Sequence, residues 1–218
     1  MDEITPVLTP PQSGALKKAR HRAACALERD TLLSLILAYL FCGTVLFALF
    51  FAEELLSFFL MPQTLMGLVI LMFLKIALAV LCFICLLLPL FAGRLRMTGL
   101  CAAGKRVALE DLFYYFGSLR LWGRGMWIAL ICPLALLPAL FSLPALAAGN
   151  DTLSMPRAAR LSAGRIPLAD VLGFWGRLLV RFLLGLLTLG LLWLMYDAHY
   201  APVSYFALVM QKQTAENA

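Results

Sequence analysis

The sequence predicts an all-α protein, a multi-pass transmembrane helical bundle. Of its 218 residues, 63% are hydrophobic and 14% are charged, whereas soluble domains average about 45–50% apolar and about 25% charged residues. A membrane-spanning helix needs about 20 predominantly apolar residues. Four runs approach or exceed that length and are apolar on nearly all sides, unlike the amphipathic helices of soluble proteins. They are Thr31–Ala52, Leu65–Ala92, Met126–Ala148 and Leu178–Tyr196.

The chain predicts one membrane domain, because no Ser/Gly-rich linker divides it. The first apolar run begins too far from Met1 for a cleavable signal peptide, so the first helix is expected to act as an uncleaved anchor. With interfacial helices included, the prediction extends from four clear hydrophobic segments to at most six membrane-associated ones. We expect a disordered tail over 1–12, the membrane domain over 13–212 with transmembrane segments at 31–52, 65–92, 126–148 (proline-broken) and 172–196, and a C-terminal tail over 213–218.

Three short basic stretches adjoin the apolar runs and predict amphipathic helices in the headgroup plane. They are Leu16–Asp30, Lys105–Phe116 and Pro156–Arg165. In the second, Leu109, Leu112, Phe113 and Phe116 have the i, i+3, i+4, i+7 spacing of one helix face. In the third, Arg157, Arg160 and Arg165 project within one arc. Because the basic residues cluster beside apolar runs, the net charge of +6 indicates anionic lipid headgroups as the partner, and no nucleic acid.

The distribution of basic residues predicts a cytoplasmic N-terminus by the positive-inside rule. The first helix then leads to an outer loop containing Glu53 and Glu54, and the second returns to the basic cytoplasmic region that follows Ala92. The third run contains three prolines, each of which removes a backbone donor and breaks or kinks a helix. We therefore expect Leu121–Ala148 to form a broken, re-entrant hairpin that returns the chain to the cytoplasmic side.

Three cations lie within the second and fourth apolar runs or at their edges, and ionisable groups at bilayer depth are functional candidates. Lys75 lies in the second run, and Arg177 and Arg181 are one helical turn apart in the fourth segment. They snorkel to the interface, line a polar cavity or bind a ligand directly. The acidic residues fall at run ends, so the sequence predicts no counter-charge for these cations and a preference of any such cavity for an anion.

Catalytic and metal-binding patterns are weak. His21 and His199 are the only histidines, too few for a clustered zinc site, and no metal or other cofactor is expected. Asp197, His199 and Tyr200 form a terminal polar cluster, read either as interfacial groups or as an Asp–His pair without a placed nucleophile. Cys82 and Cys85 form a C-x-x-C among apolar neighbours and are expected to be packing residues.

The C-terminal third resembles a known family. The segments NDTLSMPRAARLSAGR and LLTLGLLWLMYDAHYAPVSYFALV, within residues 149–209, are similar to a widespread family of bacterial multi-pass integral-membrane proteins with a domain of unknown function. Its Leu-Thr-Leu-Gly motif matches Leu187–Gly190, whereas Asp197–His199 stands where the family has Pro-Tyr. The resemblance implies a bacterial cytoplasmic membrane and a multi-pass helical domain. It implies no catalytic residues, because the family has no established activity.

These features predict a non-enzymatic membrane scaffold or accessory protein that binds anionic lipid and a membrane partner, either another protein or a second copy of the chain. The alternative is a small transporter or channel for an anionic or lipid-like solute, with Lys75, Arg177 and Arg181 in its path. A membrane-embedded enzyme is the third hypothesis. The scaffold and the transporter differ in whether water reaches these basic side chains.

Overall fold

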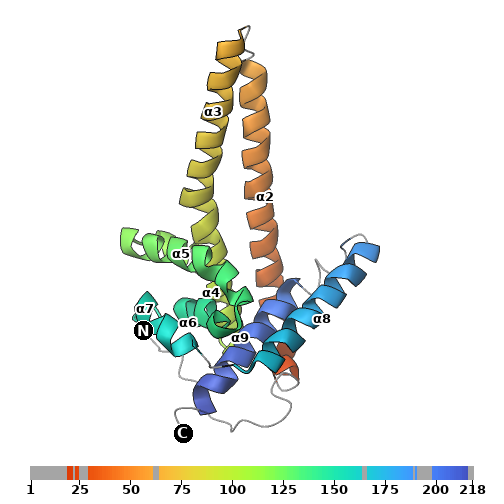
Figure 1. The fold of residues 1–218 in the computed structure, drawn as a ribbon. Coiled ribbons are helices and arrows are strands. Elements are labelled where there is room, and N and C mark those ends of the chain that lie inside the picture. The colour runs from red at the N-terminus through yellow and green to blue at the C-terminus, as the bar shows by residue number, and fades with distance from the viewer. Residues whose placement is uncertain are drawn as a thin grey trace.

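A computed structural model describes residues 19–21, 23–24, 29–60, 64–163, 166–188, 190 and 198–215, and every element within these residues is helical. Two long antiparallel helices, α2 (Arg29–Phe59) and α3 (Leu65–Cys82), form a hairpin (Figure 1). The helix containing α3 continues downward through η1 (Phe83–Leu87) into α4 (Leu88–Ala102). We call α4 and the other helices around it, at the foot of the hairpin, the base.

The hairpin follows from uninterrupted helix-forming sequence on both sides of one break. No glycine–proline pair or run of polar residues interrupts α2, which passes through Glu53 and Glu54 and ends only at Phe59. The side-chain oxygen of Thr64 accepts a hydrogen bond from Gly67 N at 3.1 Å and begins α3. The prediction that Glu53 and Glu54 lie in an outer loop is therefore wrong, because helix propensity continues beyond the apolar run.

A π-helical segment joins α3 to α4 and has a local cause. Pro89 has no N–H, so the carbonyl of Cys85, four residues earlier, loses its helical partner. That carbonyl accepts a hydrogen bond from the indole Nε1 of Trp122 at 3.1 Å. The region of Cys82 and Cys85 thus fixes α5 (Leu119–Ile131) against the foot of α3.

The basic stretch after α4 differs in winding from the predicted amphipathic α-helix. It is a 3₁₀ helix, η2 (Leu109–Phe116), in which side chains three residues apart lie on one face. Leu112 and Tyr115 are consequently both fully buried, whereas Leu109, Phe113 and Phe116 are exposed. The predicted apolar face was wrong, because it assumed 3.6 residues per turn.

Prolines divide the third apolar run into short pieces. After α5 the chain forms η3 (Cys132–Leu136), η4 (Pro138–Leu140) and α6 (Leu143–Gly149), and each of the three begins with proline in its first turn. In Figure 1, α5 lies across the direction of α2 and α3. The third run therefore changes direction inside the base rather than continuing as one straight helix.

The remaining helices complete the base. They are α7 (Met155–Ser162), α8 (Leu168–Leu187) and α9 (Ala198–Ala215). The predicted fourth segment 172–196 is helical in α8, but residues 189 and 191–197 lie outside the described part of the chain. The predicted tail 1–12 also lies outside it, and α9 extends into the predicted tail 213–218 as far as Ala215.

α9 packs into the core of the base. Val203, Phe206 and Leu208 are each at most 1% exposed. Phe206 packs so close to α4 that a Cβ at Gly99 would lie 2.9 Å from its ring. The apolar residues of α9 are therefore buried by protein.

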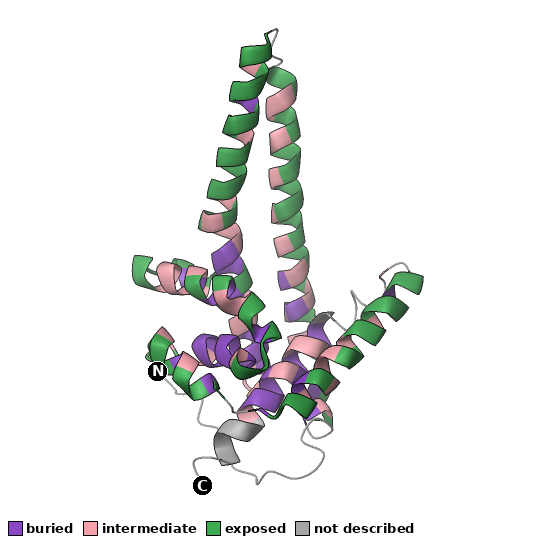
Figure 2. Ribbon diagram, in the orientation of Figure 1, coloured by how far each residue is buried: buried purple, intermediate pink, exposed green. Residues whose placement is uncertain are grey.

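Exposure separates the hairpin from the base (Figure 2). Large apolar side chains along α2 and α3 are exposed, including Phe47 at 69% and Phe73 at 70%, whereas the buried residues concentrate in the base. Within the described residues, three helical stretches are long and apolar enough to cross a membrane: Thr31–Phe59, Leu65–Ala102 and Leu119–Leu136. The predicted all-helical fold is confirmed for the described residues. Four membrane-spanning segments were predicted, and three stretches of sufficient length and apolarity are found.

A charged network holds the base together. The Asp151 carboxylate accepts hydrogen bonds from Arg96 Nη1 at 2.9 Å and from the Tyr114 hydroxyl at 2.6 Å, and Arg124 Nε lies 3.6 Å from it. The Arg96 guanidinium also stacks 3.7 Å from the Tyr114 ring centroid. Arg124 donates to the carbonyls of Ala147, Asn150 and Leu153. These bonds tie α4, η2 and α5 to the turn between α6 and α7.

Candidate functional site

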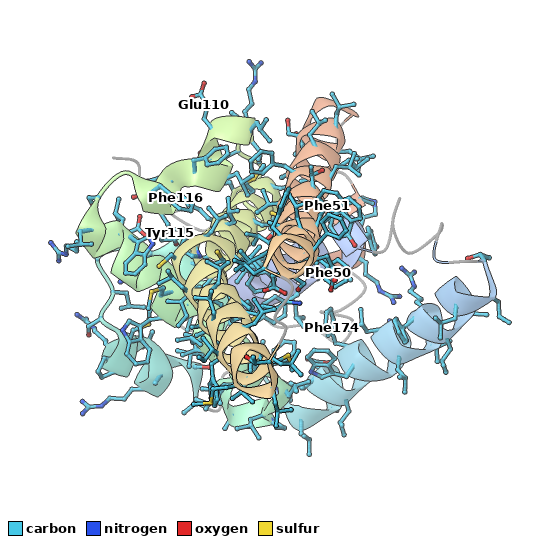
Figure 3. The ribbon with its side chains drawn as sticks, turned by 90° about the horizontal axis from the view of Figure 1, so that it is seen from above. Phe50, Phe51, Glu110, Tyr115, Phe116 and Phe174 are labelled. Carbon is cyan, nitrogen blue, oxygen red and sulfur yellow. The ribbon has the colours of Figure 1, made fainter. Side chains whose placement is uncertain are left out.

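The predicted basic residues fall in three separate parts of the molecule. Lys75 is on α3 of the hairpin, Arg157 and Arg160 are on α7, and Arg177 and Arg181 are on α8. Both Figure 1 and the view from above in Figure 3 place α7 and α8 on different sides of the base. Arg165 lies outside the described residues. The structure therefore does not combine these cations into one site or one path.

Lys75 has an acidic neighbour. Its Nζ lies 3.8 Å from Glu54 Oε1 across the hairpin. The prediction that these cations have no counter-charge is wrong for Lys75, because α2 continues far enough to place Glu54 opposite α3. The pair joins the two arms and explains Lys75 without a ligand.

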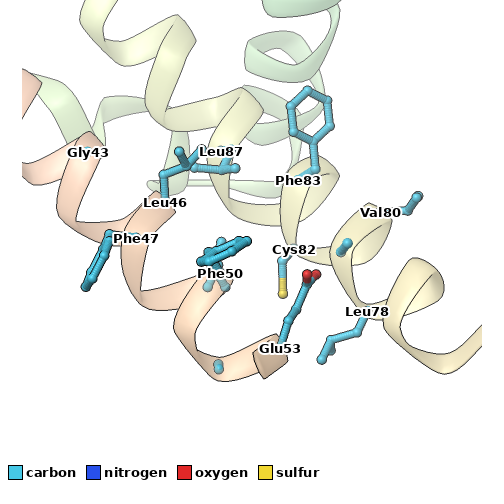
Figure 4. A pocket seen from close by; sticks show the side chains of 13 residues that line it. Gly43, Leu46, Phe47, Phe50, Glu53, Leu78, Val80, Cys82, Phe83 and Leu87 are labelled. Carbon is cyan, nitrogen blue, oxygen red and sulfur yellow. The ribbon is translucent and has the colours of Figure 1, made fainter. Parts of the chain in front are cut away.

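A cleft lies between the arms of the hairpin. It has a volume of about 830 Å³ and is lined by apolar side chains of α2, α3 and η1, including Phe47, Phe50 and Phe83. Figure 4 shows Glu53 and Cys82 on facing sides of this cleft. The lining contains almost no hydrogen-bonding groups, so the cleft suits apolar chains rather than a polar substrate.

On α7, Arg157 and Arg160 are both exposed, and Arg160 lies in the last turn, where a cation complements the helix dipole. Ala158 on the opposite side of the helix is fully buried against α6. The helix thus presents two arginines outward on one surface. Such a surface binds anions by charge and has no enclosed pocket of its own.

Arg177 and Arg181 enter a more specific arrangement with Arg20. They are one turn apart on α8 and line a small pocket of about 20 Å³, which has room for about one water molecule, together with Arg20, Tyr200 and Ser204. The Arg181 guanidinium lies 5.6 Å from the centroid of the Tyr200 ring, and the Tyr200 hydroxyl donates to the Arg20 carbonyl at 3.1 Å. Tyr200 thereby connects α8, α9 and the segment before α2. We call this site the arginine pocket.

The electrostatics of the arginine pocket favour an anion. Burial lowers the pKa of Arg20, and the positive charges of Arg177 and Arg181 lower it further. The described lining residues other than the three arginines are neutral: Phe174, Leu178, Tyr200, Ala201 and Ser204. Like charges brought together at one protein surface repel one another, and an anion between them relieves that repulsion. Guanidinium groups also match the geometry of phosphate and carboxylate oxygens.

A second hollow adjoins the arginine pocket. It has a volume of about 330 Å³, and six aromatic residues from α2, α4, α8 and α9 line it: Tyr39, Phe91, Phe174, Trp175, Tyr205 and Phe206. Phe174, Leu178 and Ala201 line both hollows, so the two share a wall. Figure 3 shows Phe174 beside the part of α8 that lies towards the centre of the molecule. We call this hollow the aromatic groove.

The predicted terminal polar cluster does not form one site among the described residues. Asp197 lies outside them, and His199 and Tyr200 face different surroundings. Tyr200 lines the arginine pocket, whereas His199 is 1% exposed with its ring 5.9 Å, centroid to centroid, from Tyr39. Within the described part of the chain, neither ring nitrogen of His199 has a hydrogen-bond partner. Its place in the core favours a packing role.

Sequence reasoning missed Arg20 and the Asp151 network. Arg20 is one of several basic residues in its stretch, and nothing local distinguishes it from its neighbours. Asp151 carried a usable signal, because it is a lone carboxylate between an apolar helix and a basic one, close in the chain to Arg124. Its partners Arg96 and Tyr114 depend on the path of the chain.

Among the described residues, no three His, Cys, Asp or Glu side chains group as a metal site.

Fold and site together define an all-helical protein with membrane-length apolar helices and a cationic pocket at their foot. No family model, curated protein or solved structure matches the chain. The function is therefore argued from the geometry alone.

Proposed function

We propose that this protein is a non-enzymatic membrane scaffold of the bacterial cytoplasmic membrane that binds anionic lipid through the arginine pocket. The observation that carries the proposal is the grouping of three arginines, Arg20, Arg177 and Arg181, around one pocket. Lipid headgroups are the anions that surround every membrane protein, and the cytoplasmic leaflet is rich in them. The proposal includes a membrane partner, either another protein or a second copy of the chain.

In this proposal the hairpin crosses the bilayer and the base lies at its cytoplasmic face, with the N-terminus also cytoplasmic. The exposed apolar side chains of α2 and α3 support the first part. Since α5 lies across the hairpin direction, it then runs along the interface, with Trp127 and Leu130 exposed towards lipid. Arg157 and Arg160 on α7 add a further cationic surface at the same level.

The alternative of an anion transporter receives less support. It required Lys75, Arg177 and Arg181 in one path, but Lys75 faces Glu54 in the hairpin, whereas the two arginines lie in the base. An enzyme hypothesis would need an activated nucleophile or a metal-binding group at the arginine pocket. Its described lining contains the hydroxyls of Tyr200 and Ser204 but no histidine, cysteine or carboxylate that would activate them or hold a metal. The scaffold proposal requires only that the three arginines line one pocket.

The test compares two double variants that each remove two positive charges. Arg177→Gln/Arg181→Gln alters the arginine pocket, whereas Arg157→Gln/Arg160→Gln alters the exposed surface of α7. We expect the purified protein in detergent to retain phosphatidylglycerol over phosphatidylcholine, measured by native mass spectrometry. The pocket variant should lose about tenfold or more of this binding, because a hydrogen bond to a charged group is worth about 1.5–3 kcal/mol. The α7 variant should keep most of it.

The proposal fails if the wild-type protein binds both lipids equally. It also fails if both double variants lose phosphatidylglycerol to the same extent, since binding would then depend on net charge alone. Circular dichroism of each variant confirms that the helices remain folded.

A further inference from the structure

We infer that the arginine pocket and the aromatic groove form one site for an anionic amphiphile, with a phosphate among the three arginines and a single acyl chain in the groove. This inference rests on the proposed function and specifies its ligand. The two hollows share Phe174, Leu178 and Ala201 in their walls. Because the arginine pocket holds only about 20 Å³, the phosphate binds at its mouth, while the apolar end of the same molecule enters the groove of about 330 Å³. A small hydrophilic anion would bind at the mouth alone.

The arginine pocket selects the headgroup chemistry. Arg177 and Arg181 are four residues apart on α8, so their side chains emerge on one face at neighbouring positions. Arg20 approaches from the segment before α2, and the bond from Tyr200 to its carbonyl fixes its backbone. Guanidinium groups on opposite sides can bind several oxygens of one phosphate. A carboxylate has fewer oxygens and satisfies fewer of these donors.

The aromatic groove selects the chain. Its volume of about 330 Å³ falls within the roughly 300–1,000 Å³ of small-molecule sites. Its walls are aromatic, aliphatic and proline side chains with few polar groups, among them Arg94 and Thr98. Such a lining stabilises methylene groups by removing them from water and offers little to a sugar or a nucleotide.

The location of the site supports a lipid as the source of the phosphate. α8 and α9 lie at the foot of the hairpin, below the arms whose apolar side chains are exposed. In a bilayer this is the depth at which phosphates meet acyl chains. The outer face of α8 is itself apolar, with Leu179 and Leu183 exposed by 60% and 53%, so lipid surrounds the entrance.

Three soluble probes separate the headgroup from the chain. Long-chain lysophosphatidate carries both, glycerol 3-phosphate lacks the chain, and long-chain lysophosphatidylcholine lacks the net negative charge. Binding to the full-length protein in detergent is measured by native mass spectrometry and by thermal stabilisation. We expect lysophosphatidate to bind at least about tenfold tighter than either other probe, since burial of two methylene groups already accounts for about tenfold.

A matched pair of variants tests the groove. Ala135 is buried and lines the groove, whereas its neighbour Leu134 is exposed and does not. Ala135→Phe should fill part of the groove and weaken lysophosphatidate about tenfold, and Leu134→Phe should leave binding within about twofold. If Ala135→Phe does not fold, the three probes on the wild-type protein still decide the question.

The outcomes distinguish the inference from the proposed function. If glycerol 3-phosphate binds as tightly as lysophosphatidate, or Ala135→Phe folds and binds normally, the chain site is wrong while anion binding by the arginines remains. If lysophosphatidylcholine matches lysophosphatidate and Arg177→Gln has no more effect than Arg157→Gln, both are wrong. A preference for lysophosphatidate that is lost in both Ala135→Phe and Arg177→Gln supports one continuous site.

Discussion

His199 shows how the base treats a titratable side chain. It is 1% exposed, and its ring packs edge-on against Tyr39. The Arg94 guanidinium also lies over the Tyr39 ring, 4.7 Å from the ring centroid. Burial, followed by the positive charge of Arg94, lowers the pKa of His199 from 6.5 to about 4. The imidazole is therefore neutral at pH 7 in the folded protein. An unfolded chain would bind a proton at this residue more readily than the native state does.

This difference predicts an acid-sensitive stability. The contribution of His199 is complete above pH 6.5 and is lost as the pH falls from about 6.5 towards about 4, because the unfolded state takes up the proton first. Between pH 7 and pH 5 the loss amounts to about 2 kcal/mol. The melting temperature measured in detergent should fall more steeply with decreasing pH for the wild type than for His199→Gln.

His21→Gln is the control for this measurement, because His21 is exposed. Its pH dependence should match that of wild type. Identical slopes for wild type and His199→Gln would contradict the buried neutral state of His199.

α4 and η2 cross at close range in the base. Gly93 on α4 faces the backbone of Leu112, and a Cβ at position 93 would lie 2.0 Å from the Leu112 carbonyl oxygen. The 3₁₀ winding of η2 brings Leu112 and Tyr115 onto this same face. Only glycine allows the two backbones to meet at this distance, and the buried positions of both side chains depend on it.

Gly93→Ala should therefore destabilise the protein by about 3 kcal/mol or more, since backbone atoms and not a movable side chain oppose the added methyl group. Gly123→Ala in α5 is the matched control, because nothing lies within 4 Å of its added Cβ. We expect the control to raise stability by about 0.5–1 kcal/mol through helix propensity. Melting temperatures measured by tryptophan fluorescence compare the two. Equal melting temperatures would show that α4 and η2 do not approach as described.

The whole molecule is divided between an exposed apolar hairpin and a base with its own core (Figure 2). The hairpin returns the chain to the side from which it entered, so its turn and the base lie at opposite ends (Figure 1). Where a proline breaks a helix, another group can donate a hydrogen bond to the carbonyl that lost its partner, as the Trp122 indole does to the Cys85 carbonyl. The base therefore tolerates irregular backbone that an isolated helix in lipid would not.

This arrangement predicts the sides from which two positions react with an impermeant thiol reagent in a cysteine-free background. Thr64→Cys near the hairpin turn should label from outside, and Arg160→Cys on α7 should label only from the cytoplasmic side. Both side chains are exposed, whereas Ser162 is buried and bonded to Ser142, so it would be a poor probe. Labelling of Arg160→Cys from outside would mean that the α5–α6 region crosses the membrane. Labelling of both from one side would exclude a spanning hairpin.

The sequence by itself determined the features that depend on neighbours along the chain. Long apolar runs without breakers predicted the helices of the hairpin, and the prolines at 133, 138 and 144 lie where the third run breaks. Composition favoured a membrane protein for the same local reason, because apolarity on all sides of a helix favours an apolar surrounding.

Only the tertiary structure decided which distant side chains meet. Arg20 and Arg181 are separated by most of the chain, yet they line one pocket, and α9 packs into the core of the base. Glu54 faces Lys75 because the register of the hairpin sets it there. Helix periodicity predicts which residues share a face within one helix. These contacts between helices depend instead on the direction in which the chain turns at each break.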